Sequence, residues 1–116
     1  MSIRKTNVVD WLGLEKGTND LLLTVVDDED WANEREHLEL LQEKLNSYLA
    51  FIESGEVYER FASEVDRTVS TESPVKVSIL AKYPVPPRAH DFLKHAQDMF
   101  ETAGFALAHK VLPALE

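Results

Sequence analysis

The segment WANEREHLELLQEKLNSYLAFIESGE, from Trp31 to Glu56, predicts one long amphipathic helix, and no other stretch limits the fold of the chain as strongly. At about 100° per residue, one face of this helix collects the apolar side chains expected on a core: Leu38, Leu41, Leu45, Tyr48, Leu49 and Ile52. A second stripe, partly apolar, lies to one side and consists of His37, Leu40, Lys44, Tyr48 and Phe51. A helix that rests on one sheet buries a single stripe, so the second stripe requires another helix, a loop or another chain.

Both ends of this helix are marked by local signals. Asn33 with Glu36 forms a candidate capping box, so we expect the helix to start between Asp30 and Asn33. Gly55 supplies the left-handed backbone conformation at which helices commonly stop. The acidic side chains in the first turn also suit the positive end of the helix dipole.

Four other segments have the composition of β-strands. Val8–Leu14 and Leu21–Val26 are joined by a short segment with Gly17 and Asn19, which predicts a hairpin. Val75–Tyr83 alternates apolar and polar residues, as a strand with one buried face does. The fourth expected strand covers Phe105 to Leu112.

A second helix is expected from about Arg88 to Ala103, where the apolar residues form one stripe. Glu56 to Ala62 carries weak signals for a helical turn or an extended piece, and the polar residues 63–73 predict a mobile loop. The order β-β-α-β-α-β predicts an α+β two-layer sandwich, in which two helices lie on one face of a four-stranded sheet. We expect a single domain over residues 1–116.

The alternation of side chains assigns a face to each strand residue. We expect the core face to carry Val9, Trp11, Leu21, Leu23, Val25 and the odd-numbered series that begins at Val75. The open face then presents Val8, Asp10, Leu12, Leu22, Thr24, Val26, Lys76 and Leu80. This open face is more apolar than a solvated sheet face usually is, so it is a second candidate for contact with another chain.

The net charge, the cysteine content and the lack of long apolar runs argue against several classes of protein. The net charge of −9, from 12 basic and 21 acidic residues, argues against binding to nucleic-acid phosphates or to anionic membrane surfaces. The absence of cysteine excludes disulfides and thiol chemistry, and it fits a reducing cytoplasm. The N-terminus lacks the apolar run of a secretory signal, and no stretch approaches the roughly 18 apolar residues of a membrane span.

No motif in the sequence predicts catalytic residues, a cofactor or a metal site. His90 and His95 are five positions apart, which is not the spacing of paired helical ligands, and His37 and His109 stand alone. The acidic run Asp27–Asp30 lacks the ligand pattern of an EF-hand loop. The chain also has no glycine-rich phosphate loop and no nucleophile elbow.

Four segments, NVVDWLGLEK, HLELLQEKLNSYLAFIESGE, KYP and TAGFAL, together resemble a bacterial domain-of-unknown-function family of short acidic α+β proteins. The resemblance covers most of the chain, and the helix segment is its specific part. It implies a small, bacterial, cytoplasmic protein, and it brings no activity, cofactor or catalytic residue.

The residues favour a non-enzymatic protein-binding or assembly module that forms a homodimer. The contact would lie on the open sheet face or on the helix flank of Leu40, Phe51, Tyr48, His37 and Lys44. An alternative is an immunity-like or antagonist protein, which binds a basic partner through the acidic row Glu36, Glu39 and Glu43. A third hypothesis is a small-molecule binder or enzyme with a pocket lined by Tyr58, Arg60 and Arg67.

Overall fold

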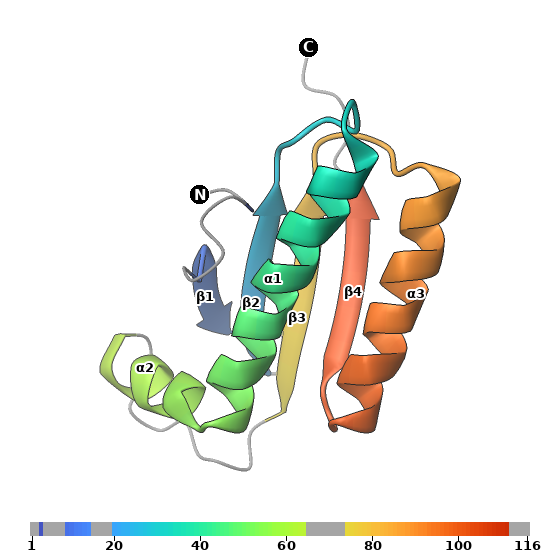
Figure 1. Cartoon of the computed structure of the whole chain (residues 1–116). Helices are drawn as coiled ribbons and strands as arrows, with labels where there is room; N and C mark the ends of the chain where they lie inside the picture. The colour runs from blue at the N-terminus through green and yellow to red at the C-terminus, as the bar shows by residue number, and fades with distance from the viewer. Residues whose placement is uncertain (1–2, 4–8, 15–19, 65–73, 112–116) are drawn as a thin grey trace.

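The computed structural model of the chain describes residues 3, 9–14, 20–64 and 74–111 (Figure 1). The elements in these residues are β1 (Trp11–Leu14), β2 (Leu21–Asp27), α1 (Glu34–Glu53), α2 (Glu56–Glu64), β3 (Val75–Ala81), α3 (Pro87–Thr102) and β4 (Ala106–Val111). The α+β class and the four-stranded sheet predicted from the sequence are therefore confirmed. None of the helices in this described part is long and apolar enough to cross a membrane.

The strands follow one another across the sheet in the order β1-β2-β3-β4. β1 and β2 form the predicted antiparallel hairpin, whereas β2, β3 and β4 are parallel to their neighbours. Helical crossovers join the parallel strands, and α1 and α3 lie on the same face of the sheet (Figure 1). The carboxyl ends of β2, β3 and β4 consequently meet at one edge of the sheet.

The predicted helix count was one too low, because the described residues include α2 between α1 and β3. α2 takes in the uncertain segment Glu56–Ala62 and also Ser63 and Glu64, which we had expected in the loop. Val57 and Phe61 are four residues apart and both fully buried, which is the spacing of one helical face. The remainder of the predicted mobile loop, residues 65–73, lies outside the described residues.

Both predicted end signals of α1 are confirmed. The side chain of the N-cap residue Asn33 accepts a hydrogen bond of 3.1 Å from the backbone N–H of Glu36. Gly55 follows the C-cap residue Ser54 and has a φ of 85°, a conformation that side-chain-bearing residues rarely adopt. This glycine allows the chain to turn directly from α1 into α2.

The core lies between the sheet and the helices. The odd-numbered residues of β2 and β3 point toward the helices, and most are fully buried. They pack against one apolar stripe from each of α1 and α3, which includes Leu41, Leu45, Ile52, Leu93 and Phe100. Removing such side chains from water stabilises the fold by about 1.5–3 kcal/mol each.

Two side chains of the second stripe of α1, Lys44 and Tyr48, are held by the residue before β1 and by β2. Lys44 is 0% exposed, and its Nζ atom lies 2.8 Å from Oδ1 of Asp10. The other carboxylate oxygen of Asp10 accepts a hydrogen bond of 2.9 Å from the backbone N–H of Val26. The Tyr48 hydroxyl donates to the carbonyl of Thr24 at 2.6 Å and accepts from the N–H of Asp10 at 2.8 Å. Burial raises the pKa of this hydroxyl, which therefore keeps its proton.

These contacts overturn the predicted role of three side chains. We had expected Lys44, Tyr48 and His37 to face another chain, but all three are buried inside the protein. Their polar atoms satisfy partners within the fold, so they offer no contact surface. Leu40 and Phe51 are half-buried and pack against the core, and their role in an interface stays a prediction.

The same contacts reverse the predicted face of β1. Because Asp10 points inward to Lys44, Leu12 points inward as well and packs on the core, although we had placed both on the open face. Trp11 points the other way and is 48% exposed, so its prediction as a core residue was wrong. Because side chains alternate along a strand, an error of one residue in the predicted alternation assigns every side chain of β1 to the wrong face.

Removing Lys44 alone should destabilise the fold strongly. Lys44→Ala leaves the Asp10 carboxylate buried without its counter-charge, which costs about 3–5 kcal/mol. The double variant Asp10→Asn/Lys44→Met keeps an oxygen for the Val26 N–H without a buried charge, and it should recover most of this loss. Urea unfolding measures both free energies. Lys94→Ala, at an exposed lysine of α3, is the control, and a Lys44→Ala loss no larger than that of the control would contradict the account.

Candidate functional site

The sheet face that points away from α1 and α3 is the main candidate surface. Register and alternation assign to it the side chains of Trp11, Gly13, Leu22, Thr24, Val26, Lys76, Ser78, Leu80, Ala106, Ala108 and Lys110. Trp11, Thr24, Ser78 and Ala108 lie in one row across all four strands. We call this surface the open face.

Trp11 is held flat on the open face by a glycine. A Cβ atom at Gly13 would lie 2.4 Å from Cη2 of Trp11 and 2.8 Å from Cζ2, so the indole occupies the space above Gly13. On its other side, Trp11 is the direct cross-strand neighbour of Thr24, which is buried. The indole is therefore supported from below and beside, and about half of its surface stays exposed.

The charges of the molecule are divided between its two sides. The described strands place only lysines among the charged residues of the open face, namely Lys76 and Lys110. Exposed carboxylates line the outer side of α1 instead, where Glu36, Glu39 and Glu43 follow one another. The predicted acidic row is thus exposed, while the open face is apolar and basic in a chain of net charge −9.

A second polar cluster lies at the carboxyl ends of the parallel strands. Oδ2 of Asp27, the last residue of β2, is 2.6 Å from Nε2 of His37, and both side chains are 2% exposed. Nδ1 of His37 lies 2.8 Å from the carbonyl oxygen of Asp30, so Nδ1 carries a proton and donates it. Trp31 stacks on the imidazole with ring centroids 3.5 Å apart and an interplanar angle of 1°. The cluster ties the loop before α1 to the helix.

Burial at this edge of the sheet shifts the pKa values of two titrating side chains. Burial raises the pKa of the Asp27 carboxyl above its usual value, against the hydrogen bond from His37 that lowers it. Burial lowers the pKa of His109 on β4; the nearby Asp27 charge opposes this shift, and His90 adds to it. Asp27 and His37 are each 2% exposed, and their bonds to one another and to the Asp30 carbonyl support the loop.

The structure brings three of the four histidines toward one edge, although the sequence spacing gave no sign of this. Within the described residues, however, no group of three or more His, Asp or Glu side chains is placed to hold a metal ion. The signal that could have located the cluster is Asp27, which ends a buried strand at the edge where parallel strands present their last residues.

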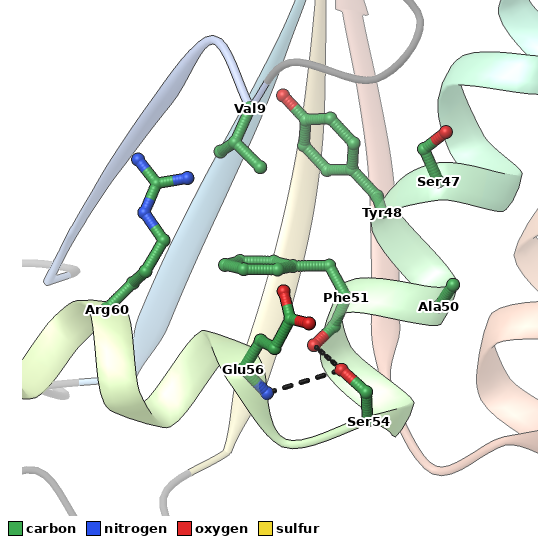
Figure 2. A pocket seen from close by; sticks show the side chains of 8 residues that line it. All are labelled: Val9, Ser47, Tyr48, Ala50, Phe51, Ser54, Glu56 and Arg60. Atoms are coloured by element: carbon green, nitrogen blue, oxygen red, sulfur yellow. Dashed lines mark hydrogen bonds between the residues drawn. The ribbon is translucent and has the colours of Figure 1, made fainter.

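A hollow of about 450 Å³ lies where α1 meets α2 (Figure 2). Phe51 and Arg60 face one another across it, with the guanidinium carbon 5.7 Å from the ring centroid. Other polar groups in the hollow serve the fold, since the Ser54 hydroxyl donates to the Phe51 carbonyl and accepts from the N–H of Glu56. The hollow is lined by Val9, Ser47, Tyr48, Ala50, Phe51, Ser54, Glu56 and Arg60.

This hollow is where the small-molecule hypothesis would apply. Arg60 lines it as that hypothesis requires, whereas Tyr58 is half-buried and packs against the core. Arg67 lies outside the described residues. Glu56 and Arg60 place opposite charges on the rim, so the hollow has no concentrated charge with which to select an ionic ligand.

The chain belongs to the DUF6572 family, a family of unknown function, whose model matches residues 1–113. The resemblance to a domain-of-unknown-function family over most of the chain is thereby confirmed. No curated protein and no solved structure matches the chain significantly. The argument for function therefore depends on the surfaces described above.

The lowered pKa of His109 predicts a loss of stability on acidification. In the folded chain this side chain binds a proton more weakly than in the unfolded chain, where a histidine titrates near 6.5. As the pH falls below 6.5 toward the lowered folded value, the unfolded state takes up the proton first, and the free energy of unfolding decreases. Asp27 has the opposite sign, because its raised pKa makes the folded state hold a proton more tightly than the unfolded state does.

His109→Gln should therefore flatten the fall in stability just below neutral pH. Urea unfolding at a series of pH values measures the slope for the wild type and the variant. Above pH 6.5, the free energy of unfolding should change with pH equally in the wild type and the variant. Equal slopes within the window would show that His109 does not carry the effect.

Proposed function

We propose that the protein is a non-enzymatic protein-binding module that self-associates through its open face, with Trp11 as an anchor of the contact. The observation that carries this proposal is the half-exposed indole held on Gly13, at a face that α1 and α3 leave uncovered. Tryptophan is enriched among the residues that dominate binding energy at protein interfaces. Because the ring is already held in place, binding costs little side-chain entropy.

The strand order supports a specific pairing of two copies. A twofold axis parallel to the strands would set β1 of one copy over β4 of the other. Trp11 would then meet the part of the partner's face that carries Ala108 and Lys110. This arrangement keeps the lysines of the two copies apart and gives each indole an apolar and a cationic neighbour.

The size of the open face favours a dimer of moderate strength. Four strands about 4.8 Å apart and six residues of about 3.3 Å each give a flat area of roughly 400 Å². A standard stable interface buries about 800 Å² on each partner. The proposed dimer therefore forms in a concentration-dependent way.

The interior polar groups support a non-enzymatic role. Asp10 is bonded to Lys44 and Asp27 to His37, and these side chains are all buried by the fold. Their pairing within the fold explains these four side chains as structural, and each of them is 7% exposed or less. A bacterial cytoplasm is the compartment we propose, in keeping with the absence of cysteine.

Binding of a basic partner through the acidic face of α1 is the second candidate. Glu36, Glu39 and Glu43 are exposed on successive turns, and Arg35 pairs with Glu39 at 3.2 Å while both remain largely in solvent. Such a surface would give fast, salt-sensitive association with a cationic protein. Self-association through the apolar open face would change little with salt.

Trp11→Lys should abolish self-association and leave the domain folded, since this side chain already faces solvent. We expect the wild-type mass to rise with concentration from 13.2 kDa toward twice this value in sedimentation equilibrium, while the variant stays monomeric. Met99→Lys is the matched control, because Met99 is 47% exposed but lies on α3, on the opposite side of the sheet. This control should dimerise like the wild type.

Gly13→Ala supplies an independent variant that keeps the tryptophan but displaces its ring, and it should weaken the dimer. A wild type that stays monomeric at all concentrations would overturn the proposal. If Trp11→Lys dimerises as strongly as the wild type, the open face is not the contact surface. Loss of the dimer in Phe51→Asp alone would then favour the α1 flank.

A further inference from the structure

The segment 28–33, which connects β2 to α1, is fastened to the fold by the buried pair of Asp27 and His37. We call this segment the strap. Both side chains of the pair are 2% exposed, and Nε2 of His37 lies 2.6 Å from Oδ2 of Asp27. Trp31, in the middle of the strap, stacks on the imidazole, and the Asp30 carbonyl bonds its Nδ1. The imidazole is thus held between the last residue of β2 and two residues of the strap.

The hydrogen-bond partners of His37 fix the number of protons in the pair. A carbonyl oxygen can only accept, so the bond to Asp30 requires a proton on Nδ1. The 2.6 Å contact between Nε2 and the Asp27 carboxylate oxygen requires a second proton between these two atoms. The pair therefore has no net charge, whether this shared proton stays on the imidazole or on the carboxyl group.

Loss of the shared proton makes the contact unfavourable. The lone pair of Nε2 then faces the carboxylate charge of Asp27 at 2.6 Å, and neither side chain is open to solvent. A buried acceptor without a donor and a buried charge without a counter-charge both cost free energy. The imidazole regains a donor for Nε2 by turning it toward water. That movement breaks the stack with Trp31 and the bond to Asp30.

Charged groups from the neighbouring elements act on the pair. Burial raises the pKa of the Asp27 carboxyl, the bond and charge of His37 oppose this rise, and the charge of Asp28 adds to it. On β4, His109 lies within reach of the Asp27 charge and of His90 on α3. The other titrating or charged residues around the pair are Glu29 and Asp30 of the strap, Glu36 in the first turn of α1, and Lys82 after β3. The strap and α1 contribute carboxylates, and negative charge hinders the loss of a proton.

We propose that the Asp27–His37 pair is a pH-sensitive latch, which holds the strap closed while the shared proton is present and releases it at alkaline pH. In the unfolded chain, a histidine loses its proton near pH 6.5 and an aspartate near pH 3.8. Above pH 6.5, only the closed strap keeps this proton, so the free energy that favours closure decreases as the pH rises. The open strap exposes both side chains of the pair to water. No residue of the open face takes part, so the latch does not depend on the proposed dimer.

The fluorescence of Trp31 reports on the strap in a Trp11→Phe background, where it is the only tryptophan. A titration from about pH 6 to about pH 9.5 stays below the ordinary range of tyrosine and lysine side chains, near 10. As the strap opens, we expect the emission to shift to longer wavelength and acrylamide quenching to rise, because the indole leaves the imidazole. The change should reverse on return to pH 6, and far-UV circular dichroism should stay constant.

Asp27→Asn is the decisive variant, because it keeps the bonds of this residue and removes the titrating proton. The Oδ1 atom of the amide can accept from the N–H of Glu29, as the carboxylate does at 3.3 Å, and the amide N–H can donate to Nε2 of His37. The alkaline change in Trp31 fluorescence should therefore disappear. His109→Gln is the matched control, because it removes a neighbouring titrating group outside the pair, and its strap should open like that of the wild type.

Nitrogen NMR of the imidazole ties the change to the pair and requires no substitution within it, so it decides the question even if Asp27→Asn does not fold. The Nε2 signal of His37 should become that of an unprotonated nitrogen over the same pH range in which Trp31 fluorescence changes. Fluorescence that is constant over the whole range, or that changes equally in Asp27→Asn, would overturn the latch. Loss of the helical signal at the same pH would show unfolding of the whole domain and contradict a local opening.

Discussion

The buried ion pair between Asp10 and Lys44 is the interaction on which the rest of the structure depends. It joins the residue before β1 to the middle of α1, 34 positions along the chain. A carboxylate and an ammonium group are costly to bury, and the fold compensates through the Val26 N–H bond to the Asp10 carboxylate and through the Tyr48 ring, whose centroid lies 5.8 Å from Nζ of Lys44. Because Asp10 must point inward, Trp11 must point outward. One polar contact in the core thus determines what the opposite face of the sheet presents.

This constraint gives the protein two unlike sides. The helical side carries the acidic row Glu36, Glu39 and Glu43 on α1, while the open face is apolar and carries only lysines among the charged residues of the described strands. The proposed dimer uses the open face, so the acidic rows of both copies stay accessible on the outer surfaces of the pair. A basic partner that itself carries two binding segments would engage both rows of one assembly and bind more tightly than a partner with a single segment.

The sequence predicted best what local chemistry determines. The start of α1 follows from Asn33 and Glu36, and its end follows from Gly55, since capping depends on neighbouring residues alone. The face of β1 was wrong because the partner of Asp10 lies far along the chain, and an isolated carboxylate in a strand normally predicts solvent. α2 was missed because a single buried pair, Val57 and Phe61, is too short a pattern to distinguish a helix. Strand order arises only when distant elements pack together.

The exposure of Trp11 across a dilution series tests the central claim most directly. In a Trp31→Phe variant, which keeps an aromatic ring against His37, the fluorescence reports on Trp11 alone. Acrylamide quenching at low protein concentration should be strong, because the indole faces solvent in the monomer. It should weaken as concentration rises and a second copy covers the ring. Quenching that is weak at every concentration would place Trp11 in the core, and strong quenching that never changes would contradict the proposed contact.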